Sequence, residues 1–147
     1  MQKTPAKPRR IEFIGTHKND SIVIGNYGDV RLIAQGTFDL SGLIYCGKNT
    51  VEINLAGDGT VSFSGVCKKL MIRGIEGNCL LNLTNLSSDT VWCESIKGTS
   101  IINLGPTRLI ELISLDNEAV VRYPGKALLL NYSLRGNSKI ESLETTG

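Results

Sequence analysis

A short pattern recurs at an almost constant interval along this chain of 147 residues. It consists of an apolar residue, a glycine or asparagine two positions later, a small residue at the fifth position, and apolar residues at the seventh and ninth. Copies begin at Ile24, Leu55, Ile75, Ile96, Leu115 and, less regularly, Leu134. The last five starts are 20, 21, 19 and 19 residues apart. A period of this length is typical of a solenoid, in which each coil packs only on its neighbours.

The columns of the repeat predict a sharp corner followed by a β-strand. The third column holds only glycine and asparagine, which enter the left-handed backbone region most readily: Asn26, Gly57, Gly77, Gly98, Asn117 and Gly136. The fifth column is always small, as expected where stacked corners leave little room: Gly28, Gly59, Cys79, Ser100, Ala119 and Ser138. The seventh and ninth columns flank a polar residue, as in Val61-Ser62-Phe63, which indicates a strand with one buried face.

A second strand leads into each corner, at residues 50–55, 69–75, 91–96 and 109–115. Arg73 and Glu94 fall where Ile53 would face inward, which indicates a bulge or a change of register. Residues 107–115 also fit an amphipathic helix, but the repeat assigns them to a strand. The 31 residues from Ile24 to Leu55 leave room for an extra half coil around Phe38.

These features predict an all-β protein, a single-chain β-solenoid of six or seven coils with about 20 residues per coil. A β-sandwich also has short strands between frequent turns. It would not explain matching corners in successive repeats, so the solenoid is the preferred fold.

The charge distribution divides the chain into two parts. There are 16 Lys and Arg against 14 Asp and Glu, or +2 overall. Four of the bases, Lys3, Lys7, Arg9 and Arg10, lie in the first ten residues, so the rest carries 12 bases against 14 acids, or −2. We predict a basic, proline-containing arm at residues 1–10 and a β-solenoid domain at 11–147. Four bases outside an aromatic context do not predict nucleic-acid binding.

No apolar run reaches the roughly 18 residues of a transmembrane helix, so no membrane span is expected. No apolar signal core follows the basic arm. The sequence therefore fits a cytoplasmic protein, or a protein of the cell envelope or periplasm from which a leader was removed.

The four cysteines do not form a metal-binding pattern. Cys46, Cys67, Cys79 and Cys93 are 21, 12 and 14 residues apart, and His17 is the one histidine. Zinc ligands are usually more closely spaced. Two disulfides are an alternative in an oxidising compartment, but we predict small buried thiols, because a chain of this length does not need cross-links. His17 is expected to be exposed in a polar loop.

The outward acids do not predict an active site. One corner column contains Asp58, Asn78, Thr99 and Glu118, and its neighbour contains Glu76, Lys97, Asp116 and Arg135. The second column alternates in sign, which predicts ion pairs between stacked coils. We find no catalytic, cofactor-binding or metal-binding residue and expect a protein that is not an enzyme and has no cofactor. Trp92, between two core positions, is the one candidate for an exposed contact.

The repeats resemble those of the head-GIN domain family, described as adhesin heads of autotransporters. The similarity covers roughly residues 21–143, which end in Val121-Arg-Tyr123-Pro-Gly125 and a last coil that contains Gly136-Asn-Ser138-Lys-Ile140. Its most specific part is the Tyr-x-Gly sequence Tyr123-Pro124-Gly125 before that coil. Of the family's recurring Gly-x-Gly pairs, Gly57 and Gly59 keep both glycines. The resemblance implies a right-handed β-helix in bacterial, often surface-associated proteins.

Three hypotheses for the function follow. The first is a noncatalytic structural or interaction module, adhesin-like at the cell envelope, that binds a protein or glycan surface. The second is a self-assembling, bactofilin-like scaffold, a homo-oligomer that stacks through its solenoid ends. Pro5, Pro8 and the polar residues 141–147 are expected to cap those ends and to favour a monomer. The third is a carbohydrate-binding or carbohydrate-active β-helix.

Overall fold

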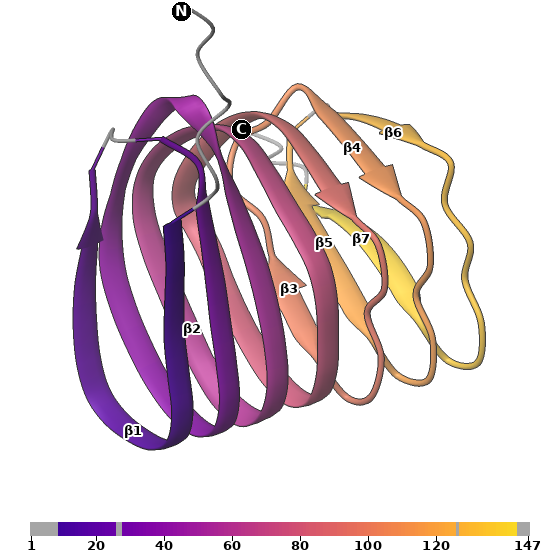
Figure 1. Cartoon of the computed structure of the whole chain (residues 1–147). Coiled ribbons are helices and arrows are strands. Elements are labelled where there is room, and N and C mark those ends of the chain that lie inside the picture. The colour runs from indigo at the N-terminus through magenta and orange to yellow at the C-terminus, as the bar shows by residue number, and fades with distance from the viewer. Residues whose placement is uncertain (1–8, 26–27, 126, 144–147) are drawn as a thin grey trace, which may run out of the picture.

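The computed structural model describes residues 9–25, 28–125 and 127–143. They form an all-β protein of parallel strands, stacked as a β-solenoid of about seven turns around one hydrophobic core (Figure 1). The strands are β1 (Arg9–Ile24), β2 (Val30–Cys93), β3 (Ile101–Asn103), β4 (Leu109–Leu112), β5 (Val120–Pro124), β6 (Leu128–Leu130) and β7 (Lys139–Leu143). β2 is 64 residues long because it continues around several coils without a break. The predicted solenoid is confirmed.

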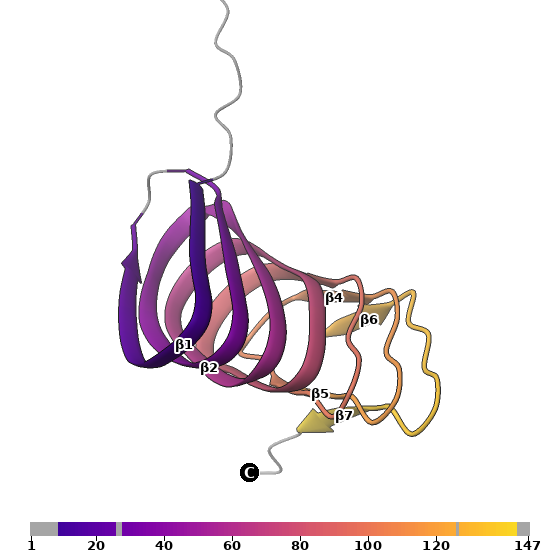
Figure 2. The same cartoon turned by 60° about the horizontal axis from the view of Figure 1, so that its bottom comes forward.

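Each coil forms parallel strand pairs with the next coil. The paired residues are separated in sequence by about the length of one repeat. Arg9 lies opposite Val30, 21 residues along the chain. In the later coils the interval is 19 residues, as between Ile102 and Val121 or Val121 and Ile140. Figure 2 shows the first coils stacked on one another, with β4 and β6 on one side of the later coils and β5 and β7 on the other. β4 is a strand, so the repeat assigned residues 109–112 correctly and the helical alternative is wrong.

The corner column is confirmed from Gly57 onward, and its beginning is corrected. Residues with positive φ stack at the corner: Gly15, Gly36, Gly57, Gly77, Gly98, Asn117 and Gly136. The column therefore continues back through Gly36 and Gly15. Asn26, proposed as its first member, lies outside the described residues. The corner glycines are needed because a Cβ at Gly57 would lie 2.1 Å from the Gly36 carbonyl oxygen.

The predicted extra half coil around Phe38 is wrong. Phe38 is a core residue of a complete coil and occupies the fifth column of the repeat, two residues after the corner at Gly36, where the repeat predicted a small residue. The following coil leaves room for the Phe38 ring by having a glycine, Gly59, at the same column. A Cβ on Gly59 would lie 2.3 Å from Cδ2 of the ring. A large side chain in one coil thus fits against a glycine in the next.

The predicted irregularity at Arg73 and Glu94 is confirmed. In the preceding coil, apolar core residues alternate strictly at Val51, Ile53 and Leu55. In the next coil, two residues, Arg73 and Gly74, separate buried Ile72 from buried Ile75. Later coils keep this spacing, and β2 ends at Cys93, just before Glu94. Arg73 and Glu94 therefore face outward.

The two proposed caps lie largely outside the described residues. β1 begins at Arg9, and residues 1–8, with Pro5 and Pro8, are not described. Residues 144–147 are also not described. Residues 141–143 belong to β7, which pairs regularly with β5. The division into an arm and a domain therefore stays a prediction.

Candidate interaction surfaces

The alternating corner column does not form ion pairs. Among the described residues, none of Glu76, Lys97, Asp116 and Arg135 has an oppositely charged partner within 4.0 Å, so that prediction is wrong. The column lies on the solvent-facing corner, and Asp116 interacts locally: its Oδ1 accepts a hydrogen bond of 2.7 Å from the Asn117 backbone nitrogen. This contact is made within the corner and not between coils.

The charge ladder lies on the face that leads into the corner, three residues before that column at Arg73 and Glu94. Arg31 Nε is 2.6 Å from Glu52 Oε2, and Arg73 Nε is 3.1 Å from Glu52 Oε1. Arg73 Nη1 lies 3.9 Å from Glu94 Oε2. The Glu52 side chain is only 10% exposed and also accepts a hydrogen bond from Asn54 Nδ2. These alternating charges recur in the sequence every 21 residues, outside the corner columns.

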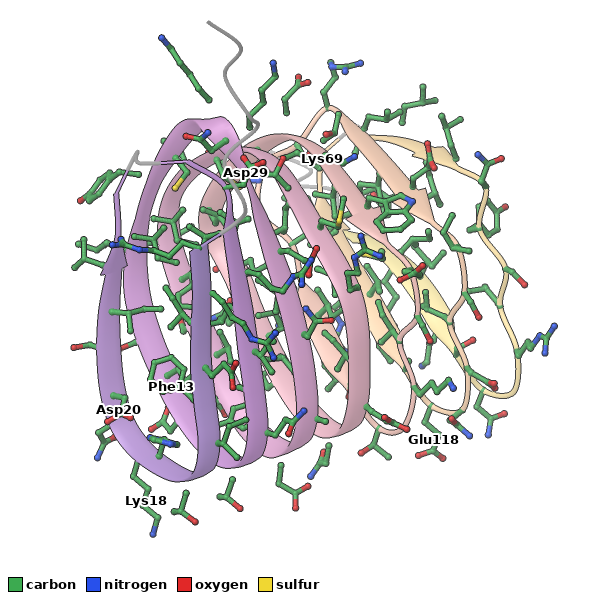
Figure 3. The ribbon with its side chains drawn as sticks, viewed as in Figure 1. Phe13, Lys18, Asp20, Asp29, Lys69 and Glu118 are labelled. Atoms are coloured by element: carbon green, nitrogen blue, oxygen red, sulfur yellow. The ribbon has the colours of Figure 1, made fainter. Side chains whose placement is uncertain are left out.

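Trp92 lies beside this ladder and is half-buried, with its side chain directed outward as predicted. Lys69 Nζ lies 6.0 Å and Arg73 Cζ 5.8 Å from the ring centroid, both within range of cation–π attraction. Figure 3 marks Lys69 at the upper side of the solenoid. The ring is thus already engaged by cations of the neighbouring coil. Its role as an external contact stays a prediction.

Two shallow grooves follow the outer faces. One, of about 220 Å³, runs beside the bulge and includes Gln35, Asn54, Glu76 and Lys97. The other, of about 430 Å³, is lined by the exposed apolar side chains of Val23 and Leu43 and by hydroxyl and amide side chains: Ser21, Ser41, Ser62, Ser64, Asn82, Thr84 and Asn85. The second lining contains no charged side chain, and its one aromatic residue, Phe63, is buried. It therefore contains neither an acid–base pair nor an exposed ring on which a sugar would stack.

All four cysteines are free and buried, as predicted. Burial raises the pKa of Cys67 and of Cys93 to about 12. Burial also raises the pKa of Cys79 to about 11, against the lowering effect of its hydrogen bond with Ser100. Burial, and secondarily the negative charge of Asp29, raises the pKa of Cys46. Buried thiols that resist ionisation are poor nucleophiles and poor metal ligands.

We expect the native protein to react very slowly with a thiol reagent at pH 8, and all four thiols to react rapidly after unfolding in urea. The native pKa values exceed the ordinary value of 9.0, so the unfolded thiols ionise first as the pH rises. The stability contributed by the neutral thiols is therefore complete below pH 9 and is lost as the pH approaches 12. Urea unfolding at several alkaline pH values measures this loss. Fast labelling of the native protein would contradict the burial.

The first coil places polar side chains in core columns. His17 lies opposite Phe38 and Asp20 opposite Leu40, both of which are buried. His17 Nδ1 is 2.9 Å from Asp20 Oδ2, and Nε2 is 2.9 Å from the Ile14 carbonyl oxygen. Figure 3 shows Asp20 and Phe13 on this coil, and the Phe13 ring meets the His17 ring edge-on at 5.3 Å. The expected exposed loop is wrong, because His17 is half-buried within β1.

The first coil has two exposed apolar side chains, Ile14 at 53% and Val23 at 71%, and the last coil has more of them in close succession. Four side chains on and after β6 are 37–58% exposed: Leu128, Leu130, Tyr132 and Leu134, which we call the C-terminal patch. Leu129 and Ile140 pack on the core from the same coil. Within the described residues, β6 pairs only with β4, and β7 pairs only with β5. Their outer backbone edges thus have no partner strand in this part of the chain.

Within the described ranges, no three His, Cys, Asp or Glu side chains come together in a group suited to a metal ion. No helix in these ranges is long and apolar enough to cross a membrane. Comparison of the chain with protein-family models, curated proteins and solved structures gives no match.

Proposed function

We propose that the protein is a noncatalytic structural module that associates with protein through the edge of its last coil. The observation that carries the proposal is the C-terminal patch, in which four large apolar side chains are exposed on and after β6, whose outer edge has no partner strand among the described residues. Exposed apolar patches commonly mark interaction sites, and an open strand edge accepts another strand by backbone hydrogen bonding.

Self-association is the form of this function that the geometry favours. Residues 141–143 were expected to help cap the last coil, but they continue β7 as a regular strand. An adhesin-like role at a cell envelope rests on the sequence resemblance alone, and no feature of the described surface favours it over self-association. A carbohydrate-related role has little support, because the hydroxyl-lined groove lacks an exposed aromatic ring.

The test is the molar mass measured by light scattering over a wide range of protein concentration. We expect the mass of the unmodified protein to rise with concentration, and Leu130→Lys to suppress the rise by placing a charge in the patch. Leu80→Lys is a matched control, because Leu80 is 38% exposed and Leu130 is 37% exposed, while Leu80 lies outside the patch. Circular dichroism verifies that both variants fold. A constant monomer mass, or equal effects of the two substitutions, would refute the proposal.

A further inference from the structure

We infer that the partner is a second copy of this chain, joined last coil to last coil about a two-fold axis, so that assembly stops at a closed dimer. This inference rests on the proposed function and adds to it the identity and orientation of the partner. Three features carry it: the His17–Asp20 pair in the core columns of the first coil, the C-terminal patch of the last coil and the charge sequence of β7.

The difference between the ends opposes head-to-tail stacking. Such stacking would press the last coil of one copy against the first coil of the next, where His17 and Asp20 occupy core columns. In a continued register Asp20 would lie opposite Ile140, so its partly exposed carboxylate would be removed from water without gaining a polar partner there. Inward-facing charged residues on an edge strand are a known obstacle to edge pairing. Contact between two last coils avoids this cost.

The sequence of β7 is complementary to itself in an antiparallel arrangement. Lys139 and Glu141 both face outward on either side of Ile140, which packs on the core. If two β7 strands pair antiparallel with Ile140 at the two-fold axis, Lys139 of each copy lies opposite Glu141 of the second copy. Opposite charges across an antiparallel pair are stabilising, and like charges are destabilising. The two ion pairs would be equivalent by symmetry.

A two-fold contact uses the same surface on both copies and therefore closes. Once two last coils have met, each free end of the dimer is a first coil with its His17–Asp20 pair. These ends resist further stacking, because a coil packed on them would remove the Asp20 carboxylate from water. The inference therefore predicts a ceiling of two chains, in contrast to the open filaments that head-to-tail stacking would build.

The experiment compares two charge substitutions alone and mixed, by sedimentation equilibrium. In Lys139→Glu or Glu141→Lys protein, both symmetry-related contacts become repulsive, and we expect dimerisation to weaken about ten-fold. Mixing the two variants restores opposite charges at both contacts, so the mixture should dimerise more tightly than either variant alone. Glu118→Lys takes the place of Glu141→Lys in a control mixture with Lys139→Glu. It makes the same charge change as Glu141→Lys, but at an exposed corner away from β7. Thermal unfolding verifies that Glu141→Lys, which also loses the ion pair with Arg122, still folds.

The outcomes separate this inference from the proposed function. A mass that levels off at two chains, with association restored in the mixture of Lys139→Glu and Glu141→Lys but not with Glu118→Lys, supports the two-fold dimer. Growth beyond two chains, or no restoration in the mixture, overturns the dimer and leaves association through the C-terminal patch standing. A monomer at every concentration overturns both.

Discussion

Gly57→Val is expected to remove a large part of the stability of the fold. Gly57 has a φ of 128°, in the region that side-chain-bearing residues rarely adopt, and a β-branched residue is especially unfavourable there. A Cβ at this position would lie 2.1 Å from the Gly36 carbonyl oxygen and 3.0 Å from the Gly36 nitrogen. Both atoms are backbone of the stacked coil, so no side-chain rotation relieves the clash. We expect a loss above roughly 4 kcal/mol, from a total stability of about 5–15 kcal/mol. Loss of the β signal in far-ultraviolet circular dichroism would reveal the effect.

Gly47→Val is the matched control for the corner. Its Cβ would meet no atom within 4 Å, and its φ lies outside the left-handed region. We expect its unfolding free energy to stay within about 1 kcal/mol of the unmodified protein, because surface substitutions away from special backbone positions have small effects. If Gly57→Val is as stable as Gly47→Val, the corners do not stack in the register described.

Phe63→Ala is expected to lower the unfolding free energy by about 3–5 kcal/mol, the usual cost of removing a buried aromatic side chain. Phe63 is 2% exposed, and its ring fills the space left by Gly42 in the coil above, where a Cβ would lie 3.2 Å from Cε1. The neighbouring coils are held at hydrogen-bonding distance along both faces, so they have little freedom to collapse into the cavity. Urea unfolding monitored by circular dichroism measures the loss.

Two further substitutions make the Phe63 result specific. Phe63→Leu keeps much of the apolar volume and should cost about 1 kcal/mol. Tyr45→Ala removes an aromatic ring that is 52% exposed and should change stability by roughly 0.5 kcal/mol or less. Equal losses for Phe63→Ala and Tyr45→Ala would contradict the burial of the Phe63 ring between coils.

A structural feature could be predicted from the sequence where it depends only on the residue type at a single position of the repeat. The corner needs a positive φ, and glycine or asparagine reports that need directly at Gly57, Gly98 and Asn117. Phe38 was misplaced because it fits only through compensation by Gly59 in another coil. A pattern read from each repeat separately cannot predict that a large residue in one coil is balanced by a glycine in the next coil.

The interaction surfaces depend on position in the stack, which residue types alone do not report. Asp20 aligns with a core column, but its carboxylate is tolerated because no described coil covers it on the outer side. Leu130 shares a column with Trp92 and Glu111. Its importance as a surface residue comes from its place on the last described coil of the solenoid. The Arg31–Glu52–Arg73 ladder was detectable by its 21-residue interval, provided that the non-corner columns were compared.

The nearly constant interval between paired residues also has a consequence for how the chain folds. Between the labelled strands, partners are always 19–21 residues apart in sequence. Each added coil therefore closes a loop of about the same length, and the entropy lost in one closure does not grow as the structure lengthens. Folding of such a chain can nucleate in one pair of coils and extend to its neighbours in steps of similar size. The solenoid thus gains length without the slow, long-range searches that limit other all-β topologies.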